Sequence, residues 1–252
     1  MNYCGRCPSK FIIKGTFQEL ESFTAKKVQL IATHCTNIPI VCETATSEEC
    51  TKLSKLARSL VLLVIFDGGG SNEDDVFAVA TSRAMIKTIA SLSVNSGSNN
   101  KSSTKCLLGR SLEEEAMIDS WMTLIWNSID LPFQVALSLF GDENIATTAV
   151  VEKEGINADL IIALQTIETQ LSKQESCLPH PKMDGPLSLA ITMGSGSMDC
   201  YYTLADMSLA VTLHFMRDKN IAESALRSDK YPHLHSWMHK MHLELGLVPG
   251  RS

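Results

Sequence analysis

The first part of the chain alternates short apolar runs with segments whose apolar residues recur at helical spacing. Apolar runs bounded by polar turn residues indicate strands, whereas a recurrence such as Phe23, Leu30 and Ile31 indicates one face of a helix. We expect strands at Phe11–Lys14, Ile38–Val41, Leu60–Phe66 and Val76–Val79, and helices at Glu19–Thr33 and Thr81–Ala90. The order strand, helix, strand, hairpin, helix predicts an α+β domain.

From about residue 106 onward, apolar positions recur at helical spacing only. Ser111 and Glu114 have the spacing of a capping box at a helix start. The residues that then follow at i, i+4, i+7, i+8 and i+11 are Met117, Trp121, Leu124, Ile125 and Ser128, and Pro132 is expected to end the helix. Further helices are expected at Glu154–Lys173 and His233–Leu245. The pattern predicts an all-helical second domain.

The segment Leu204–Met216 gives the clearest helix signal in the chain. Thr203 before it and Asp206 three residues later predict a capping box. In such a box the hydroxyl accepts from a free amide, and the carboxylate reaches back to the amide of the capping residue. Apolar residues lie on nearly all sides of this helix, which is typical of a helix buried inside a helical layer.

Stretches rich in serine, asparagine, glycine and proline indicate where the folded parts end. Residues 1–10 are expected to form a flexible tail, and residues 95–105 a linker between a domain at 11–94 and a helical domain at 106–252. Within the second domain, residues 172–200 hold several prolines and glycines and predict a long loop insertion.

The composition, with 252 residues, 44% hydrophobic residues and a net charge of −6, favours a globular protein. It argues against strong direct binding of nucleic acid, because phosphate binding needs clustered Lys and Arg. The longest apolar run, Leu60–Phe66, is too short to cross a membrane, and Met1–Ser9 lacks the apolar core of a signal peptide. Eight cysteines without such a leader indicate reduced thiols, so we expect a cytoplasmic protein without membrane attachment.

Cys4 and Cys7 form a CxxC pair, which in thioredoxin-like redox sites lies where the first strand meets the first helix. Here the pair precedes the first expected strand, Phe11–Lys14, so no helix amino terminus is in place to lower the pKa of a thiol. We expect both residues to belong to the tail. A stress or redox adaptor that uses the two thiols stays an alternative.

His235, His239 and His242 are spaced i, i+4 and i+7 on the last expected helix, and two imidazoles at this spacing can hold zinc. Leu234 and Trp237 mark the core side of the same helix, so the histidines are expected to face outward. No carboxylate or thiol stands where a third ligand would be needed. We therefore expect no metal site.

Four segments in order resemble the two-domain glutathione-transferase fold over about residues 11–247. These are Gly15–Thr16 with Lys26–Lys27 and Leu30–Ala32, Thr81–Met85, Leu107–Ser111 with Trp121 and Leu131–Pro132, and Thr203–Asp206 with Tyr231–Pro232 and Trp237. The chain is most similar to the amino-terminal region of elongation factor 1 gamma. It is also similar to the related domains of aminoacyl-tRNA synthetases and to auxiliary factors of multi-synthetase complexes. The resemblance implies a thioredoxin-like α+β domain followed by an all-helical domain.

The resemblance also implies which residues an active glutathione transferase would need. Such enzymes have a group near the first strand–helix junction that holds glutathione as thiolate, and a cis-proline before the third strand. Ser22 lies near the catalytic position, and Thr16 is a second candidate. No proline stands between Pro39 and Pro132, and a cis peptide at another residue costs about 2.5–4 kcal/mol.

The family binds the γ-glutamyl end of glutathione with an acidic–Ser pair, and the matching residues here are Thr81 and Ser82. Only the serine of the pair remains. The resemblance therefore implies a vestigial glutathione site at Thr81 and Ser82, no cofactor, and a non-catalytic domain. An active glutathione transferase, with Ser22 as the catalytic residue and bound glutathione, is the alternative.

In the translation-related relatives such domains dock subunits of larger complexes. The resemblance implies partners among other glutathione-transferase-like domains, aminoacyl-tRNA synthetases or elongation factor 1 subunits, in a hetero- or homodimer. The candidate contacts are polar residues expected to be exposed at the end of the helix that begins at Leu204 and in the loop after it. They are His214, Arg217, Asp218, Arg227 and Asp229. An Arg–carboxylate pair gives a directional, two-point contact. We expect a docking domain of the eukaryotic translation machinery.

Overall fold

The chain divides into two units, Met1–Lys105 and Cys106–Ser252, each with its own core. The structure is a computed structural model. It describes residues 8–53, 60–66, 75–95, 107–109, 111–140, 156–176, 189, 202–219, 226 and 229–247.

The first unit alternates strands and helices. Its elements are β1 (Lys10–Gly15), α1 (Phe17–Leu20), α2 (Phe23–Cys35), β2 (Ile40–Thr44), α3 (Ser47–Leu53), β3 (Val61–Phe66), β4 (Asp75–Ala80) and α4 (Ser82–Asn95). The strands form one sheet in the order β2–β1–β3–β4. β1 runs parallel to β2 and antiparallel to β3, which pairs antiparallel with β4. This is the predicted thioredoxin-like arrangement, so the fold class is confirmed for this unit.

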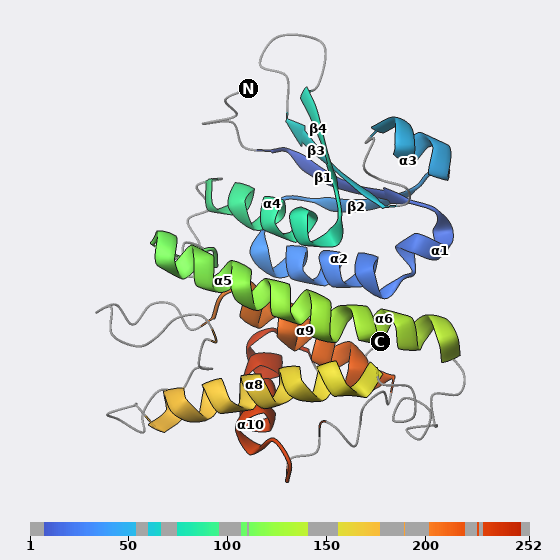
Figure 1. Cartoon of the computed structure of the whole chain (residues 1–252). Helices are drawn as coiled ribbons and strands as arrows, with labels where there is room; N and C mark the ends of the chain where they lie inside the picture. Colours follow the sequence, from blue (N-terminus) through green and yellow to red (C-terminus); the bar gives the residue numbers. More distant parts are fainter. Residues whose placement is uncertain are drawn as a thin grey trace. The chain divides into compact units, whose positions relative to one another are not determined.

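Side chains alternate between the two faces of the sheet along each strand. Both faces are covered by helices. Ile12, Val61 and Leu63 lie on one face and pack with Cys50 of α3. On the opposite face α2 and α4 lie side by side (Figure 1). That face buries Phe11, Ile13, Leu62 and Val64.

The helix expected at Glu19–Thr33 is two helices, and Ser22 is the reason. Its backbone is extended, with φ −67° and ψ 155°, and its hydroxyl accepts a hydrogen bond from the Ala25 amide. Ser22 therefore caps α2 and separates it from the single turn of α1. The helix expected to end at Ala90 also differs, since α4 continues to Asn95.

The second unit is all helical among its described residues, as expected. Its elements are α5 (Leu112–Ile125), a π-helical turn η2 (Trp126–Asp130), α6 (Leu131–Phe140), α8 (Ile156–Ser176), α9 (Leu204–Asp218) and α10 (Pro232–Glu244). Pro132 does not end the first of these helices. It lies in the first turn of α6, directly after the wide turn η2, where the α-helical hydrogen-bond ladder is already interrupted.

The spacing at Met117, Trp121, Leu124, Ile125 and Ser128 predicted the helix, but among these residues Ile125 alone is buried. Met117 is exposed and Trp121 is partly exposed. The buried side chains stand one residue further along and are Ile118, Met122, Ile125 and Ile129. Both stripes are largely apolar, so the pattern alone did not select between them.

Helix α9 is the buried centre of this unit, as predicted. Eleven of its 15 residues are buried. At its start Thr203 and Asp206 form the expected capping box. The Asp206 carboxylate accepts from the Thr203 amide and hydroxyl, both at 2.7 Å, and from the distant Leu189 amide at 2.8 Å. In the middle of α9, the Thr212 hydroxyl donates to the buried Asp130 carboxylate at 2.7 Å.

Helix α10 is held at both ends by groups that the pattern of apolar residues does not show. At its start the Glu168 carboxylate of α8 accepts from the His233 and Leu234 amides at 3.1 and 2.7 Å. At its end Gly246 adopts φ 60°, and the Leu247 amide donates to the His242 carbonyl oxygen at 2.8 Å, which is a Schellman motif. Among the described helices, none is long and apolar enough to cross a membrane.

Candidate functional site

The hydroxyl of Ser22, the candidate catalytic group, is engaged within its own turn. It donates to the Glu19 carbonyl oxygen at 2.5 Å and accepts from the Ala25 amide at 3.3 Å. A hydroxyl has one proton to donate. Ser22 must therefore break its bond to Glu19 before it can hold a glutathione thiolate.

Thr16, the second candidate, begins α1 directly after β1. Its hydroxyl oxygen accepts from the Glu19 amide at 3.4 Å, and the Glu19 carboxylate accepts from the Thr16 amide at 2.8 Å. This capping box uses Thr16 as an acceptor. The hydroxyl proton of Thr16 is left for another hydrogen bond, unlike that of Ser22.

Thr81 and Ser82 form a strained junction between β4 and α4. Thr81 has φ 73°, a conformation that a β-branched residue rarely adopts. Ser82 is 4% exposed, and its hydroxyl oxygen has no hydrogen-bond partner. Strained backbone and unpaired buried hydroxyls are both costly and cluster at functional sites. The junction therefore stays a candidate binding position.

The entry to β3 carries no feature of a glutathione site. The residue before the strand is Leu60, a buried leucine. No cis peptide bond occurs in the part of the chain that the structure describes. From Leu60 onward the chain therefore runs through β3 with trans peptide bonds.

The cysteines that the structure describes are not activated. Cys35, Cys42 and Cys50 are free thiols. Burial raises the pKa of Cys35 to about 12, and burial also raises the pKa of Cys42 and of Cys50 above the ordinary value. A thiol with a raised pKa is a poor nucleophile at neutral pH. The pair Cys4 and Cys7 lies outside the described residues.

Of the candidate contact residues at the end of α9, Asp218 is exposed, whereas His214 and Arg217 are half-buried and so less exposed than expected. The Nδ1 atom of His214 and the Nε and Nη2 atoms of Arg217 are buried and have no hydrogen-bond partner. His214 Nε2 lies 3.2 Å from Asp218 Oδ2, and the two side chains are 12% and 25% exposed. Asp229 is exposed in the loop before α10, whereas Arg227 lies outside the described residues.

His242 joins these residues from α10, and the prediction that it faces outward is wrong. It is 5% exposed, and its ring meets the His214 ring edge to face with centroids 5.4 Å apart. Its Nε2 lies 3.2 Å from the Ala210 carbonyl oxygen. His242 follows the buried Met238 by four residues, so the two lie on the same face of the helix. That spacing is the signal that would have found it.

The other two histidines of α10 behave as expected. His235 and His239 are both exposed. Within the described ranges, no group of three or more His, Cys, Asp or Glu side chains lies close enough together to hold a metal ion.

Burial controls the charge of the two clustered rings. It lowers the pKa of His242 to about 4, and the charge of Arg217 adds to the decrease while the bond to Ala210 opposes it. Burial also lowers the pKa of His214, Asp218 opposes this decrease and Arg217 adds to it. Both rings are therefore neutral at pH 7. The guanidinium of Arg217 is the permanent positive charge beside them.

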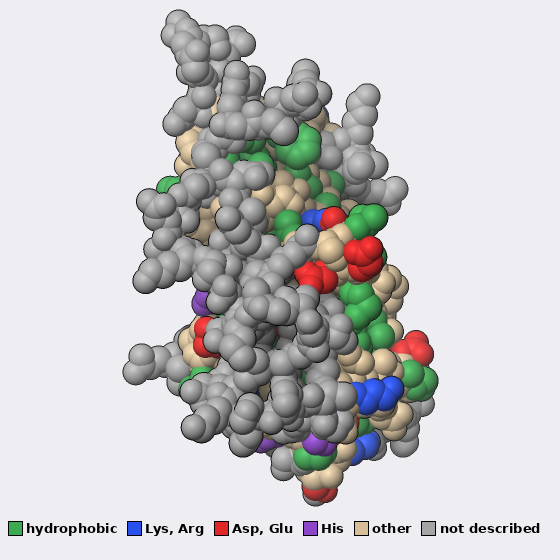
Figure 2. Space-filling model, turned by 90° about the vertical axis from the view of Figure 1, so that its left-hand side faces the viewer, with side chains coloured by type: hydrophobic (Ala, Val, Ile, Leu, Met, Phe, Trp, Pro, Cys, Tyr) green, Lys and Arg blue, Asp and Glu red, His purple; other side chains and the backbone are tan. Residues whose placement is uncertain are grey.

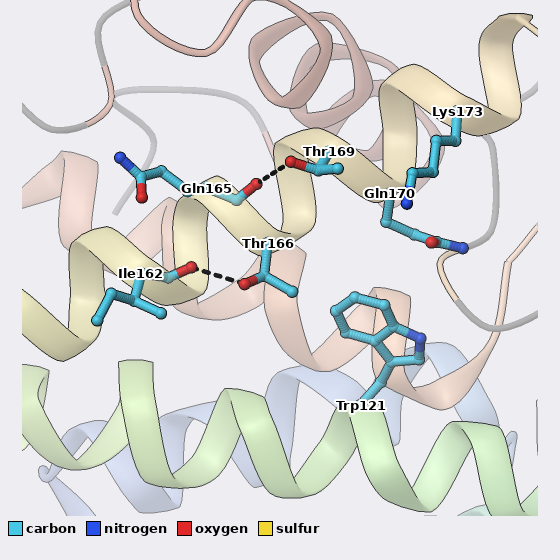
Figure 3. A pocket seen from close by; sticks show the side chains of 7 residues that line it. All are labelled: Trp121, Ile162, Gln165, Thr166, Thr169, Gln170 and Lys173. Carbon is cyan, nitrogen blue, oxygen red and sulfur yellow. Dashed lines mark hydrogen bonds between the residues drawn. The ribbon is translucent and has the colours of Figure 1, made fainter.

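An open pocket of about 340 Å³ lies between α5 and α8, lined by Trp121, Ile162, Gln165, Thr166, Thr169, Gln170 and Lys173 (Figure 3). Its two threonine hydroxyls donate within α8, Thr166 to the Ile162 carbonyl oxygen and Thr169 to that of Gln165, both at 2.8 Å. The remaining polar groups of the lining are one indole, one lysine and two amides, and Nε2 of Gln170 donates to the Leu189 carbonyl oxygen at 3.5 Å. This set does not favour any particular chemistry.

Charged side chains of the described residues are not sorted by sign on the face that Figure 2 shows. Red acidic and blue basic groups are scattered among apolar and neutral ones. A nucleic-acid-binding surface shows instead a continuous basic stripe. None is visible among the described residues on this face.

No family model matches the sequence, and no curated protein matches it either. Solved structures do match over nearly the whole chain. Poplar glutathione transferase F1 matches with a TM-score of 0.58 at 15% identity, covering 92% of this chain and 92% of that chain. Glutathione transferase Omega 2S from Trametes versicolor matches with a TM-score of 0.55 at 14% identity, covering 94% and 89%.

A third match is a glutathione transferase family member from Pseudomonas fluorescens, in a structure with two glutathione bound. Its TM-score is 0.56 at 12% identity, and the match covers 99% of this chain and 96% of that chain. At these identities the likeness concerns the fold alone. The chain has the glutathione-transferase fold.

Proposed function

We propose that this protein is a non-catalytic glutathione-transferase-fold domain that binds other proteins. Its partners are aminoacyl-tRNA synthetases, elongation factor 1 subunits or other domains of the same fold, in a hetero- or homodimer. The resemblance of the sequence to elongation factor 1 gamma carries the assignment to translation. The state of Ser22 carries the assignment as non-catalytic.

A transferase needs a free donor that holds the glutathione sulfur as thiolate. The Ser22 proton is donated to Glu19 at 2.5 Å, and this bond belongs to the cap that starts α2. The sequence has no proline directly before β3, where the family has a cis-proline. The acidic residue of the acidic–Ser pair is also replaced, by Thr81, so each of the three features departs from what the family needs.

Two observations favour the alternative function, a glutathione transferase. Ser82 keeps a buried, unpaired hydroxyl next to the strained Thr81, and Thr16 keeps a free hydroxyl proton at the start of α1. An enzyme of this kind would use Thr16 or Ser22 against the glutathione sulfur and Ser82 at the γ-glutamyl end.

An assay of glutathione conjugation and the identification of bound partners distinguish the protein-binding function from the transferase function. We expect the protein to pass through immobilised glutathione and to show no turnover of chlorodinitrobenzene with glutathione. Affinity purification from native extract should retrieve synthetases or elongation factor 1 subunits. Turnover that Ser22→Ala or Thr16→Val abolishes, and that the matched control Ser120→Ala leaves unchanged, would overturn the proposal in favour of the enzyme.

A further inference from the structure

Three basic side chains at the end of α9 and on α10 bring together buried nitrogens without partners. The atoms are Nδ1 of His214, Nε and Nη2 of Arg217, and Nδ1 of His242. The rings of His214 and His242 are in contact, and the charge of Arg217 acts on both of them. Buried polar atoms in folded proteins are nearly always paired, so four unpaired nitrogens in one place need an explanation.

The free atoms of Arg217 are those that form one edge of the guanidinium. Nε and Nη2 carry N–H bonds that point in parallel from this edge, at the separation of the two oxygens of a carboxylate. A partner with a single acceptor would satisfy only one of the two. The geometry of the arginine therefore selects a flat group with two acceptor oxygens.

The two rings can supply a further donor to such a group. Nε2 of His242 donates to the Ala210 carbonyl oxygen, because a carbonyl only accepts, and Nε2 of His214 donates to the Asp218 carboxylate for the same reason. In the neutral rings Nδ1 then has no proton and carries a lone pair, so it is an acceptor. A proton taken up at Nδ1 converts either ring into a third donor beside the two of Arg217.

We propose that Arg217, His214 and His242 form a binding site for a carboxylate of a partner protein, from an Asp or Glu side chain. This inference rests on the proposed protein-binding function and gives the chemistry of the contact. His214 and Asp218 keep a part of their side chains exposed, whereas the four nitrogens are buried, so a carboxylate reaches these nitrogens only when the side chains that cover them move.

The charges in the site favour a monoanion over phosphate. Arg217 brings one positive charge, and Asp218 already places one negative charge beside His214. With Asp218 counted, a bound carboxylate leaves one negative charge, which a proton taken up by one ring balances, whereas a doubly charged phosphate would leave two in a buried place.

Binding at this site is linked to proton uptake. The groups that face His242 are Arg217 and His214 from α9 and His239 from its own helix, and those that face His214 are Asp218, Arg217 and the His242 ring. A carboxylate added among these groups raises the pKa of both rings, so the bound form takes up a proton. We expect about tenfold tighter binding at pH 6 than at pH 8.

The test is an NMR titration of the full chain, labelled in its histidine rings, with sodium acetate against sodium chloride at equal ionic strength. We expect saturable shifts of His214 and His242 with acetate, tighter at pH 6 than at pH 8. Arg217→Gln should weaken acetate binding by about tenfold or more, and Arg217→Lys, which keeps the charge but loses the fork, should weaken it less. The exposed Lys240→Gln on α10 is the matched control.

Absence of saturable shifts, equal affinity in Arg217→Gln, or tighter binding of inorganic phosphate would each overturn the inference. Thermal unfolding of the variants checks that they are folded. The partner experiment separates the two proposals. If Arg217→Gln retrieves the same partners as wild type, the carboxylate contact is wrong and the protein-binding function stands. If wild type retrieves no translation protein while acetate binds at His242, the proposed function fails and the carboxylate site stands.

Discussion

Polar side chains are buried at both ends of helix α9, but the hydrogen bonding of these side chains differs between the two ends. At the start, three donors surround the Asp206 carboxylate at 2.7 to 2.8 Å, and both of its oxygens are used. At the other end, His214 and Arg217 together keep three buried nitrogens without a partner. The same helix therefore holds a completed polar group at one end and an incomplete one at the other.

This difference teaches that burial alone does not mark a functional residue. A buried and fully paired carboxylate such as Asp206 stabilises the fold, because each donor around it would otherwise lose a partner. Buried donors without partners, such as those of Arg217, cost free energy in the folded protein and provide binding capacity instead. Stability and binding should then respond to mutation in opposite ways at the two ends.

Asp206→Ala should have the largest effect. It leaves the Leu189 amide, the Thr203 amide and the Thr203 hydroxyl unpaired inside the protein, and we expect the free energy of unfolding to fall by about 3 kcal/mol. Urea denaturation followed by circular dichroism measures this. The exposed Asp159→Ala in the first turn of α8 should change it by only about 0.5 kcal/mol. A loss below about 1 kcal/mol for Asp206→Ala would remove the contrast.

A change of pH should show the second largest effect, through His242. Its pKa is about 4 in the folded protein and near 6.5 when the chain is unfolded. Between these values the unfolded state binds more protons, so stability is lost as the pH falls from 6.5 to 4. We expect this ring to cost about 2 kcal/mol of unfolding free energy at pH 5 relative to pH 7.

His242→Gln isolates this contribution, since its amide can still donate to the Ala210 carbonyl oxygen but does not titrate. Urea denaturation at pH 7 and pH 5 should show a smaller loss in the variant, by about 2 kcal/mol, than in wild type. Equal losses in both proteins would mean that His242 does not stay neutral when buried.

Glu168→Ala tests a completed carboxylate that is less deeply buried. The mutation removes the acceptor of two amides at the start of α10, and we expect a loss of about 1 kcal/mol, as for other helix caps. The exposed Gln165→Ala on the same helix is the control, and hydrogen exchange of the His233 and Leu234 amides is the readout. Unchanged exchange would contradict the role of Glu168.

Arg217→Met should have the smallest effect on stability, with the opposite sign. It keeps an unbranched side chain and removes the unpaired donors, so the free energy of unfolding should stay the same or rise by up to about 1 kcal/mol. Lys240→Met, on the exposed side of α10, should change it by about 0.5 kcal/mol or less. A clear loss in Arg217→Met would show that its donors have partners in solution.

The parts of the fold that the sequence predicted are those that depend on neighbouring residues. Ser111 and Thr203 cap helices through amides three residues away, and both are visible in the pattern. The α+β class of the first unit followed from the order of strands and helices along the chain. Glu168, in contrast, caps a helix 66 residues further along the chain, and no local rule connects the two.

The candidate site was less predictable, because one residue type serves two purposes. A serine at a helix start can be a cap or a reactive hydroxyl, and only the bond from Ser22 to Glu19 distinguishes them. The polar residues at the end of α9 were named from the sequence as candidate contacts, and that role stays a prediction. Their burial, and their contact with His242 from another helix, came from packing.

The turn at Gly246 has a consequence for ligand affinity. By holding the His242 carbonyl oxygen through the Leu247 amide, it fixes the backbone behind the ring, while the Ala210 carbonyl oxygen fixes the ring itself. An imidazole held in both ways has little rotational freedom left to lose when a carboxylate binds at the proposed site. The entropic cost of binding should therefore be small even for a weak ligand, because folding has already oriented the His242 ring.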